Sequence, residues 1–358
     1  MIAAPHLEQV LAELPEAPER AALVVERFGA EVVAAEARQF ALTPLLAHYL
    51  PGRFLLQQGE ELSARFLSAR LERLSLEALA ILEKANVRAA LLKGLELATR
   101  LYPEAWLRPS VDVDVLVASG EFETAARALA AAGWKQAGDP PRTAFEFSKD
   151  LAFLAPGGGM LELHFGYNAD FQARVDAQAL IARSHVVQLK GGVGRVLAAE
   201  DSLLVQCVHA AHHAFTGVKW LFDLKLEALA EPGCWDALVE RAHEYRVASA
   251  VGMSLREATR RVRATVPVAV LRRLPPGPLR ALAVRRASAA EGEDLPNLLG
   301  SLLLADGLSL GLLEEAAVRP LGRILNRAGV GTPAKRAAWI IAERLGIMRR
   351  RLTTPGSQ

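Results

Sequence analysis

Two aspartates separated by a single residue are the clearest candidates for chemistry in this sequence. Asp112 and Asp114 lie in the run VDVDVLVA, in which apolar and acidic residues alternate. The alternation predicts a half-buried strand, on which both carboxylates leave one face while Val111, Val113 and Val115 point into the core. Adjacent carboxylates repel each other, and a divalent cation would remove that penalty. Hard oxygen ligands favour Mg²⁺ or Mn²⁺, although a solvated edge face is the simpler interpretation of the pair taken alone.

A glutamate and a histidine show the same spacing on a second predicted strand. In the run MLELH, Glu162 and His164 share one face and the intervening leucines share the other. If this strand neighbours the aspartate strand, Glu162 completes a cluster of three carboxylates. Such a cluster can hold two metal ions about 3.5–4 Å apart, one activating an attacking oxygen and one stabilising a leaving group. His164 could orient Glu162, contact a substrate or act as a base, and a buried structural histidine is equally compatible with its position.

A lysine–glycine pair precedes the aspartates. The run VRAALLKG predicts a buried strand that ends at Gly94, and a helix over LELATRL follows. Such a turn presents backbone N–H groups at a helix N-terminus, which favours phosphate binding, and Lys93 would add a cation. Arg108, four residues before Asp112, could bind a triphosphate as a bidentate donor or could pair with Asp112 or Glu104. One such turn is a weak signal, but its combination with a strand carrying two aspartates is considerably stronger.

Three histidines gather in one predicted helix. His209 and His213 are four residues apart and therefore share a face, with His212 beside them. A zinc hydrolase signature would require a glutamate after the first histidine, where this chain has Ala210. We therefore favour ordinary packing, or a position of His209 or His213 near the nucleotide or the acceptor, over a zinc site.

The next predicted helix carries a lysine and an aspartate with the same spacing. Lys219 and Asp223 are four residues apart, which predicts an ion pair on the helix surface. Trp220 is interpreted as a core residue in preference to a platform on which a base stacks.

The remaining periodicity predicts a chain of class α+β. Residues 6–80 are expected to be helical, with a break at Pro51-Gly52 before a long helix at about 57–85. The order β-α-β-α-β-β follows and indicates a small mixed sheet with helices on one face. Its strands are expected at 87–94, 111–118, 143–154 and 160–167. After a Gly-rich loop at 191–194, a helical pair at 199–230 and further helices complete the chain.

These motifs together resemble the bacterial "uncharacterised nucleotidyltransferase" family of the DNA-polymerase-β-like superfamily. The resemblance covers roughly residues 35–235 and includes the later segment AEDSLLVQCVHAAHHAFTGVKWLFDL. The residues that carry it are Leu92, Lys93, Gly94, Leu101, Tyr102, Pro103, Arg108, Asp112, Asp114, Leu116, Val117, Glu162, Leu163, His164, His209, His213, Trp220 and Asp223.

The resemblance implies a polymerase-β-like nucleotidyltransferase core, in which Asp112, Asp114 and Glu162 are catalytic and hold the metal. Better-known members of the superfamily have Gly-Ser where this chain has Lys93-Gly94, so another group must replace the serine hydroxyl at the phosphates. We expect an N-terminal helical region at 1–82, the nucleotidyltransferase core at 83–198 and a C-terminal helical domain at 199–358. The expected nucleotide-binding residues are Lys93, Gly94, Arg108, His164, His209 and His213.

The composition of the chain limits the class of protein to which it can belong. Hydrophobic residues make up 51% of the 358 residues and charged residues 23%, which excludes a disordered chain. No apolar run is long enough for a membrane span, no signal peptide is indicated, and the two cysteines lack metal-type spacing, so we expect a reduced, cytoplasmic protein.

Charge is distributed unevenly along the chain. Residues 1–240 carry a net charge of −9 and residues 241–358 one of +11, the latter including a basic helix expected at 335–351. This basic third could face nucleic acid, another acidic partner or the acidic part of the same chain.

The expected function is Mg²⁺- or Mn²⁺-dependent transfer of a nucleotidyl group from a nucleoside triphosphate, with ATP as the first choice, to an unidentified acceptor. The catalytic core constrains the acceptor little, so a small molecule, a peptide, a protein and an RNA end all remain open. The alternatives are a catalytically inactive binding or regulatory protein with the same fold, and a toxin-like member that modifies RNA or protein.

Overall fold

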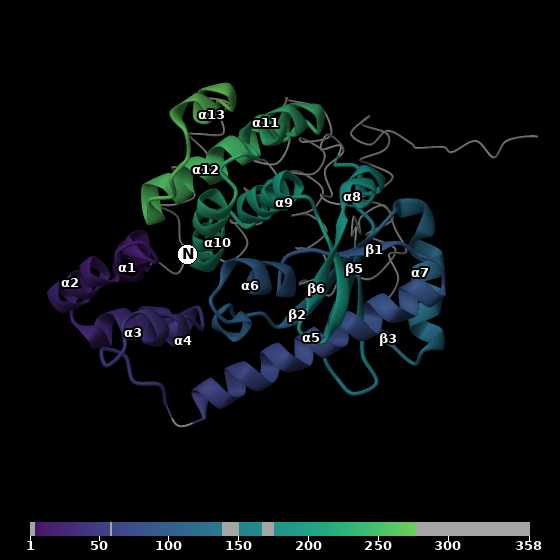
Figure 1. Ribbon diagram of the computed structural model, residues 1–358, viewed down its shortest axis with the longest axis horizontal. Helices are drawn as coiled ribbons and strands as arrows, with labels where there is room; N and C mark the ends of the chain where they lie inside the picture. Colours follow the sequence, from purple (N-terminus) through teal and green to yellow (C-terminus); the bar gives the residue numbers. More distant parts are fainter. Residues whose placement is uncertain (1–3, 58, 138–149, 167–174, 277–358) are drawn as a thin grey trace, which may run out of the picture.

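The computed structural model describes residues 4–57, 59–137, 150–166 and 175–276. The basic helix expected at 335–351 and the first part of the strand expected at 143–154 lie outside these residues. Figure 1 shows the arrangement of the elements, with a mixed sheet at the centre of a largely helical chain.

Four short helices open the chain: α1 (Pro5–Glu13), α2 (Pro18–Phe28), α3 (Ala30–Gln39) and α4 (Thr43–Tyr49). Proline stands in the first turn of α1, α2 and α4, where its fixed φ and missing N–H suit the start of a helix. The break after α4 and the long helix α5 (Glu60–Lys84) confirm the expected pattern. Buried residues at three- and four-residue spacing, Leu71, Leu74, Ala78 and Leu82, line one side of α5.

Within the described ranges, the sheet contains seven strands in the order β3-β4-β5-β2-β1-β7-β6. The two strands with the acidic motifs, β2 and β5, are parallel neighbours at its centre, and β1 pairs with β2 in the antiparallel direction. The strands are β1 (Ala89–Leu91), β2 (Asp112–Val117), β3 (Lys135–Ala137), β4 (Asp150–Leu154), β5 (Met160–His164), β6 (His185–Leu189) and β7 (Gly192–Val196).

The structure corrects the expected loop at 191–194, because these residues belong to the hairpin β6–β7. A Cβ atom on Gly194 would lie 2.7 Å from Leu189, and one on Gly191 would lie 2.9 Å from Leu76 of α5. The glycines therefore permit close packing around this hairpin, and their use inside a strand produced a loop-like sequence pattern.

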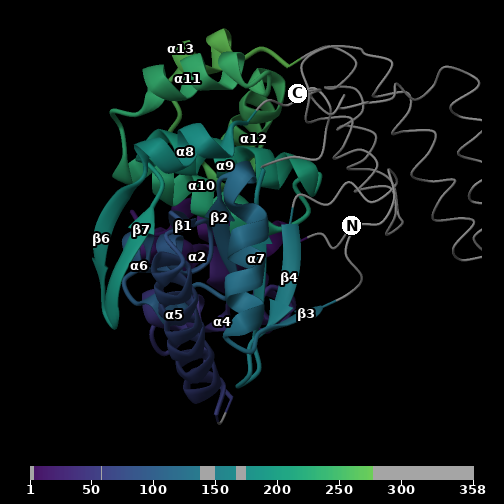
Figure 2. The ribbon, with the colours of Figure 1, turned by 90° about the vertical axis from the view of Figure 1, so that its right-hand side faces the viewer.

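The structure also corrects the expectation of helices on one face of the sheet. Figure 2 shows α5 and α7 (Phe122–Ala131) side by side over one face. There they bury alternate strand residues, among them Val113, Val115 and Leu163. Leu116 points the other way and joins a second core with α8 (Ala177–Arg183) and the later helices. Val111, expected in the core, precedes β2 and is 73% exposed.

Helix α6 (Leu95–Leu101) connects β1 and β2. The helices that follow the sheet in the described chain are α9 (Ala199–His212), α10 (Val218–Ala230), α11 (Trp235–Glu244), α12 (Ala248–Val262) and α13 (Val268–Arg273). The expected pair at 199–230 is thereby confirmed as α9 and α10. Helices α9 to α12 share one hydrophobic core with the first four helices.

Two arginines of the basic third contact acidic residues near the start of the chain. Arg261 forms a salt bridge with Glu8, and Arg263 forms one with Glu13. In the described residues, this favours the acidic part of the same chain as a partner of the basic third. Within the same residues, no helix combines the length and the apolar character needed to cross a membrane.

Candidate active site

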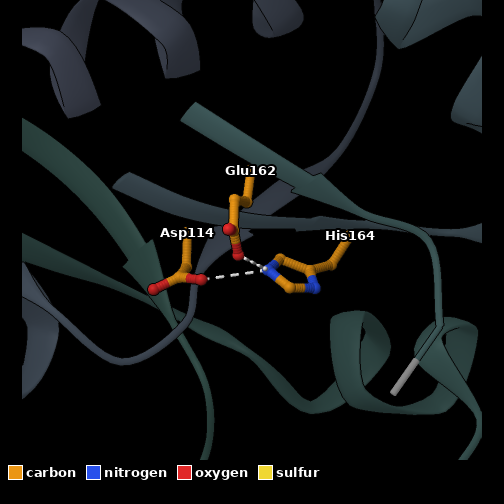
Figure 3. Close-up of side chains that lie close together, drawn as sticks. All are labelled: Asp114, Glu162 and His164. Carbon is orange, nitrogen blue, oxygen red and sulfur yellow. Dashed lines mark hydrogen bonds and ion pairs between the residues drawn. The ribbon is translucent and has the colours of Figure 1, made fainter. Parts of the chain in front are cut away.

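The register of two parallel strands brings the acidic motifs together. Asp114 of β2 lies directly opposite Glu162 of β5, and Asp112 lies opposite Met160. Because side chains alternate along a strand, Asp112, Asp114, Glu162 and His164 all project from the face opposite the α5–α7 layer. Ligand atoms of Asp114, Glu162 and His164 lie within 4.8 Å of one another, and Figure 3 shows these three side chains converging.

Asp114 is the centre of this cluster. Its Oδ1 atom lies 2.9 Å from His164 Nε2 and 2.9 Å from Lys93 Nζ, which reaches it from the turn after β1. Glu162 Oε2 is 3.5 Å from the same His164 nitrogen. The Asp114 side chain is almost fully buried, whereas that of Glu162 is 31% exposed and gives the cluster access to solvent. Lys93, predicted to contact phosphate, therefore lies against a predicted metal ligand.

The two aspartates differ in their electrostatic surroundings. Burial raises the pKa of Asp112, and the nearby Asp114 and Glu162 carboxylates raise it further. Burial also opposes ionisation of Asp114, but Lys93 and His164 outweigh it and hold the pKa of that carboxyl well below its usual range. Asp114 is thus an anion at neutral pH, whereas the charge on Asp112 is costly unless a cation balances it.

His164 is held between carboxylates on both sides of its ring. Its Nδ1 atom lies 3.9 Å from Asp150 Oδ2, and Asp150 is its direct neighbour across the β4–β5 pair. At 3.9 Å the Asp150 carboxylate is within ion-pair range of the ring but beyond hydrogen-bond distance. Sequence reasoning missed Asp150, because only the register of β4 with β5 shows that it lies opposite His164.

The protonation of His164 gives the first prediction. Burial lowers its pKa, but hydrogen bonds to Asp114 and Glu162 outweigh burial and raise the pKa to about 9 from 6.5. Because the folded pKa is the higher one, the stabilisation from the protonated ring is complete below pH 6.5 and is lost as the pH rises through about 9. Histidine NMR in EDTA, assigned with His164→Asn, should show this midpoint; a midpoint at or below 6.5 would contradict the geometry.

Arg108 does not pair with Asp112 or Glu104, the two partners considered from the sequence. It forms a bidentate pair with Asp223 of α10, with Nε 2.9 Å from Oδ1 and Nη2 2.8 Å from Oδ2. Tyr102 donates a third hydrogen bond to Asp223, at 2.7 Å. All three side chains are buried. The guanidinium edge that could have bound a triphosphate is therefore occupied, and Arg108 ties the loop before β2 to α10.

Lys219 does not form the predicted surface ion pair with Asp223. Its Nζ atom donates a hydrogen bond to the carbonyl oxygen of Pro109 at 2.9 Å, while Asp223 is taken by Arg108. Helix α10 is covered along most of its length, so its charged residues are buried or half-buried. Lys219, Asp223 and Glu227 follow one another at four-residue spacing, and the sequence pattern therefore resembles that of an exposed polar stripe.

The histidine cluster packs against Trp220. The ring of His213 lies 4.6 Å from that of Trp220 and 4.6 Å from that of His209, and His209 lies 4.8 Å from Trp220. Lys93 is close enough to contribute to the lowered pKa of both histidines, so the cluster adjoins the acidic site.

Gly94 has a backbone conformation that suits its position. It has φ +56° and precedes α6, and a Cβ atom there would lie 3.4 Å from Ser110 Oγ. Its carbonyl oxygen lies 3.4 Å from Arg108 Nη1. Left-handed backbone and a close neighbour together favour glycine at this turn.

The donor set fits a divalent cation. Asp114 and Glu162 offer hard carboxylate oxygens, His164 offers a nitrogen, and Asp112 stands two residues along the same strand face. Carboxylate oxygens suit Mg²⁺ and Mn²⁺, and the histidine nitrogen is better matched to Mn²⁺, which would have to displace the proton of the His164 ring. The pKa of Asp112 is raised because its ionised form is destabilised by burial and by the neighbouring carboxylates. A bound cation would remove this destabilisation.

Comparison with known proteins agrees with this arrangement. A family model described as "Uncharacterised nucleotidyltransferase" matches residues 28–263, whereas no curated protein matches the chain. One similar solved structure is an antigenic nucleotidyltransferase-like protein from Paracoccidioides brasiliensis, with 14% sequence identity and a TM-score of 0.32, covering 52% of this chain and 91% of that one. A structural likeness this weak adds nothing further. The family match spans more than half of the chain and includes every strand of the sheet and the whole acidic cluster, and the chain belongs to this family of uncharacterised nucleotidyltransferases.

Proposed function

We propose that this protein is a metal-dependent nucleotidyltransferase that moves a nucleotidyl group from a nucleoside triphosphate, most simply ATP, to an acceptor. The principal support is the alignment of Asp114 with Glu162 across the parallel β2–β5 pair, with Asp112 on the same face and Lys93 against Asp114. Three carboxylates and a lysine on one partly open face match the needs of phosphate chemistry with a divalent cation.

In the proposed mechanism, Asp112, Asp114 and Glu162 hold Mg²⁺ or Mn²⁺, and His164 supports the same cluster. The ion, when bound, neutralises phosphate charge and lowers the pKa of the acceptor hydroxyl. Lys93 and the backbone at Gly94 stabilise negative charge on the phosphates. Arg108 acts indirectly, because its pairing with Asp223 fixes the loop that leads into β2.

Several finer assignments form part of the same proposal. We place the catalytic core at residues 83–198 as a polymerase-β-like unit, between helical regions at 1–82 and 199–358, in a cytoplasmic protein. The acceptor is a hydroxyl of a small molecule, a peptide, a protein or an RNA end, and the basic third is a possible contact for nucleic acid. Two salt bridges from that third to the start of the chain weaken the nucleic-acid assignment.

Incubation with labelled ATP tests the reaction class. With Mn²⁺ or Mg²⁺ present, label from the α-phosphate should appear on an acceptor or on the protein, and pyrophosphate should be released. Because the metal is required, EDTA should abolish the transfer. Candidate acceptors can be supplied as cell extract fractionated into metabolites, peptides, proteins and RNA.

The pattern of label separates the proposal from its competitors. Transfer of label from the γ-phosphate alone would indicate phosphoryl transfer and reject the proposed reaction. Absence of any transfer, combined with absence of metal binding by calorimetry, would instead favour a binding or regulatory protein that keeps the fold.

A further inference from the structure

Lys219 places an ammonium group at the edge of the active site. Among the described residues, this group forms no ion pair with a carboxylate. Its Nζ atom donates a hydrogen bond to the carbonyl oxygen of Pro109, at 2.9 Å. Asp223, one turn along α10, is fully buried and is bonded by both Arg108 and Tyr102. A half-buried ammonium group that lacks an anionic partner is costly, so its position calls for an explanation.

Other cationic or ionisable groups gather at the same place. Burial, and after it the charge of Arg108, lower the pKa of Lys219 to about 8, although Asp223 and Asp112 act in the opposite direction. Burial lowers the pKa of His213 to about 4, with His212 and Lys93 acting in the same direction. Burial also holds the pKa of His209 well below its usual range, and Lys93 and Lys219 contribute. The two histidines are therefore neutral at pH 7, and the positive charge at this place comes from the lysines, which a bound anion would balance.

The turn between α9 and α10 builds this arrangement. Ala214 and Phe215 both have positive φ, 48° and 58°, so the chain reverses sharply after His213. A Cβ atom at Gly217 would lie 2.5 Å from the Trp220 ring, and only glycine leaves room for that ring to pack back on the histidines. The backbone thereby places Lys219 and two imidazoles together beside Lys93.

We propose that Lys219, His209 and His213, together with Lys93, form an anion subsite that binds the β- and γ-phosphates of the nucleoside triphosphate. This inference rests on the proposed function and deepens it by assigning the end of the substrate that leaves as pyrophosphate. The lysines supply charge, and neutral imidazole N–H groups supply hydrogen bonds. Trp220 fixes the ring orientations through its contacts with His209 and His213.

The packing of the rings favours a polyphosphate over a nucleobase at this place. His209, His213 and Trp220 contact one another with ring centroids 4.6–4.8 Å apart. Much of their ring surface is therefore already covered, and stacking of a base would require them to separate. Their polar edges and the neighbouring ammonium groups suit phosphate oxygens instead.

Calorimetry on the full-length protein tests the subsite with three probes in Mg²⁺: tripolyphosphate, ATP and AMP. Lys219→Met should weaken binding of tripolyphosphate and ATP at least tenfold and leave AMP binding unchanged. Lys219→Arg, which keeps the charge, should recover part of the loss. Lys84→Met, which removes an exposed lysine at the end of α5, is the matched control and should change nothing.

A second set of variants addresses the histidines and does not depend on the lysine. His213→Asn should weaken tripolyphosphate binding severalfold, whereas His185→Asn, at an exposed position on β6, should not. Tripolyphosphate should also change the fluorescence of Trp220, a signal that Trp220→Phe removes. Thermal unfolding of each variant identifies any loss of fold.

The outcomes separate this inference from the function on which it rests. Nucleotidyl transfer with an unchanged KM for ATP in folded Lys219→Met and His213→Asn would overturn the subsite and leave the function standing. Tight tripolyphosphate binding that depends on Lys219, in a protein that transfers no nucleotidyl group, would support the subsite and reject the function. Failure of the wild-type protein to bind tripolyphosphate would overturn the subsite.

Discussion

Replacement of Asp114 by asparagine is expected to reduce nucleotidyl transfer by about a thousandfold or more. Asparagine keeps the size of the side chain but removes the charge that holds a cation, and the loss of several kcal/mol of transition-state stabilisation corresponds to a change of this order. Asp114 is also the acceptor for Lys93 and His164, so its loss should lower the stability of the metal-free protein. Initial rates with α-labelled ATP and thermal unfolding in EDTA measure the two effects.

Asp112→Asn provides an internal contrast to this variant. We expect a similar loss of activity but an equal or higher unfolding temperature in EDTA at neutral pH. The pKa of Asp112 is raised in the folded protein, so its ionised form costs stability at pH values above its unfolded pKa, and asparagine removes that cost. Asp236→Asn, at a side chain that is 85% exposed, serves as a control for the substitution itself. Full activity of both Asp112→Asn and Asp114→Asn would reject the proposed mechanism.

Arg108→Met is expected to destabilise the fold by about 3–5 kcal/mol, the usual cost of leaving one partner of a buried pair without its counter-charge. Arg108 has a side chain that is 3% exposed, and that of Asp223 is fully buried. Among the described residues, the Asp223 carboxylate would then keep only the side-chain hydrogen bond from Tyr102. Denaturant unfolding followed by circular dichroism measures the loss.

Two further variants show whether the loss of stability comes from the unpaired charge of Asp223. The double variant Arg108→Met with Asp223→Leu should recover a substantial part of the stability, because no buried charge remains unpaired. Arg260→Met breaks an exposed pair with Glu257, in which the arginine side chain is 64% exposed, and should cost no more than about 1 kcal/mol. Equal losses in Arg108→Met and Arg260→Met would show that the Arg108–Asp223 pair has no structural role.

The local pattern predicted most of the elements that form the site. Alternation in VDVDVLVA and MLELH identifies the strands that became β2 and β5, and the acidic side of each follows from that alternation. The periodicity of α5 and of the pair α9–α10 was equally readable. These features depend on the geometry of one element at a time, and a two- or four-residue repeat is enough to reveal them.

Predictions from the sequence were wrong where the role of a residue depends on a contact with a residue distant in the chain. Glycines at 191–194 suggested a loop, because their role in close packing around the β6–β7 hairpin is not visible locally. Lys219 and Asp223 suggested a surface pair, because helical spacing does not show that α10 is covered on most sides. Arg108 found its partner 115 residues away, across the connection between the sheet and the helices.

The sequence by itself determined which residues bear the acidic, basic and imidazole groups and which face of each strand or helix they occupy. Only the tertiary structure decided that β2 and β5 are parallel neighbours in a register that sets Asp114 against Glu162, and that Lys93 and His164 share one oxygen of Asp114. It also decided that α10 brings Lys219 to the carbonyl oxygen of Pro109, three residues before Asp112. The physical reason is that side-chain direction follows from local backbone geometry, whereas strand pairing and helix docking are set by burial of apolar surface summed over the whole chain.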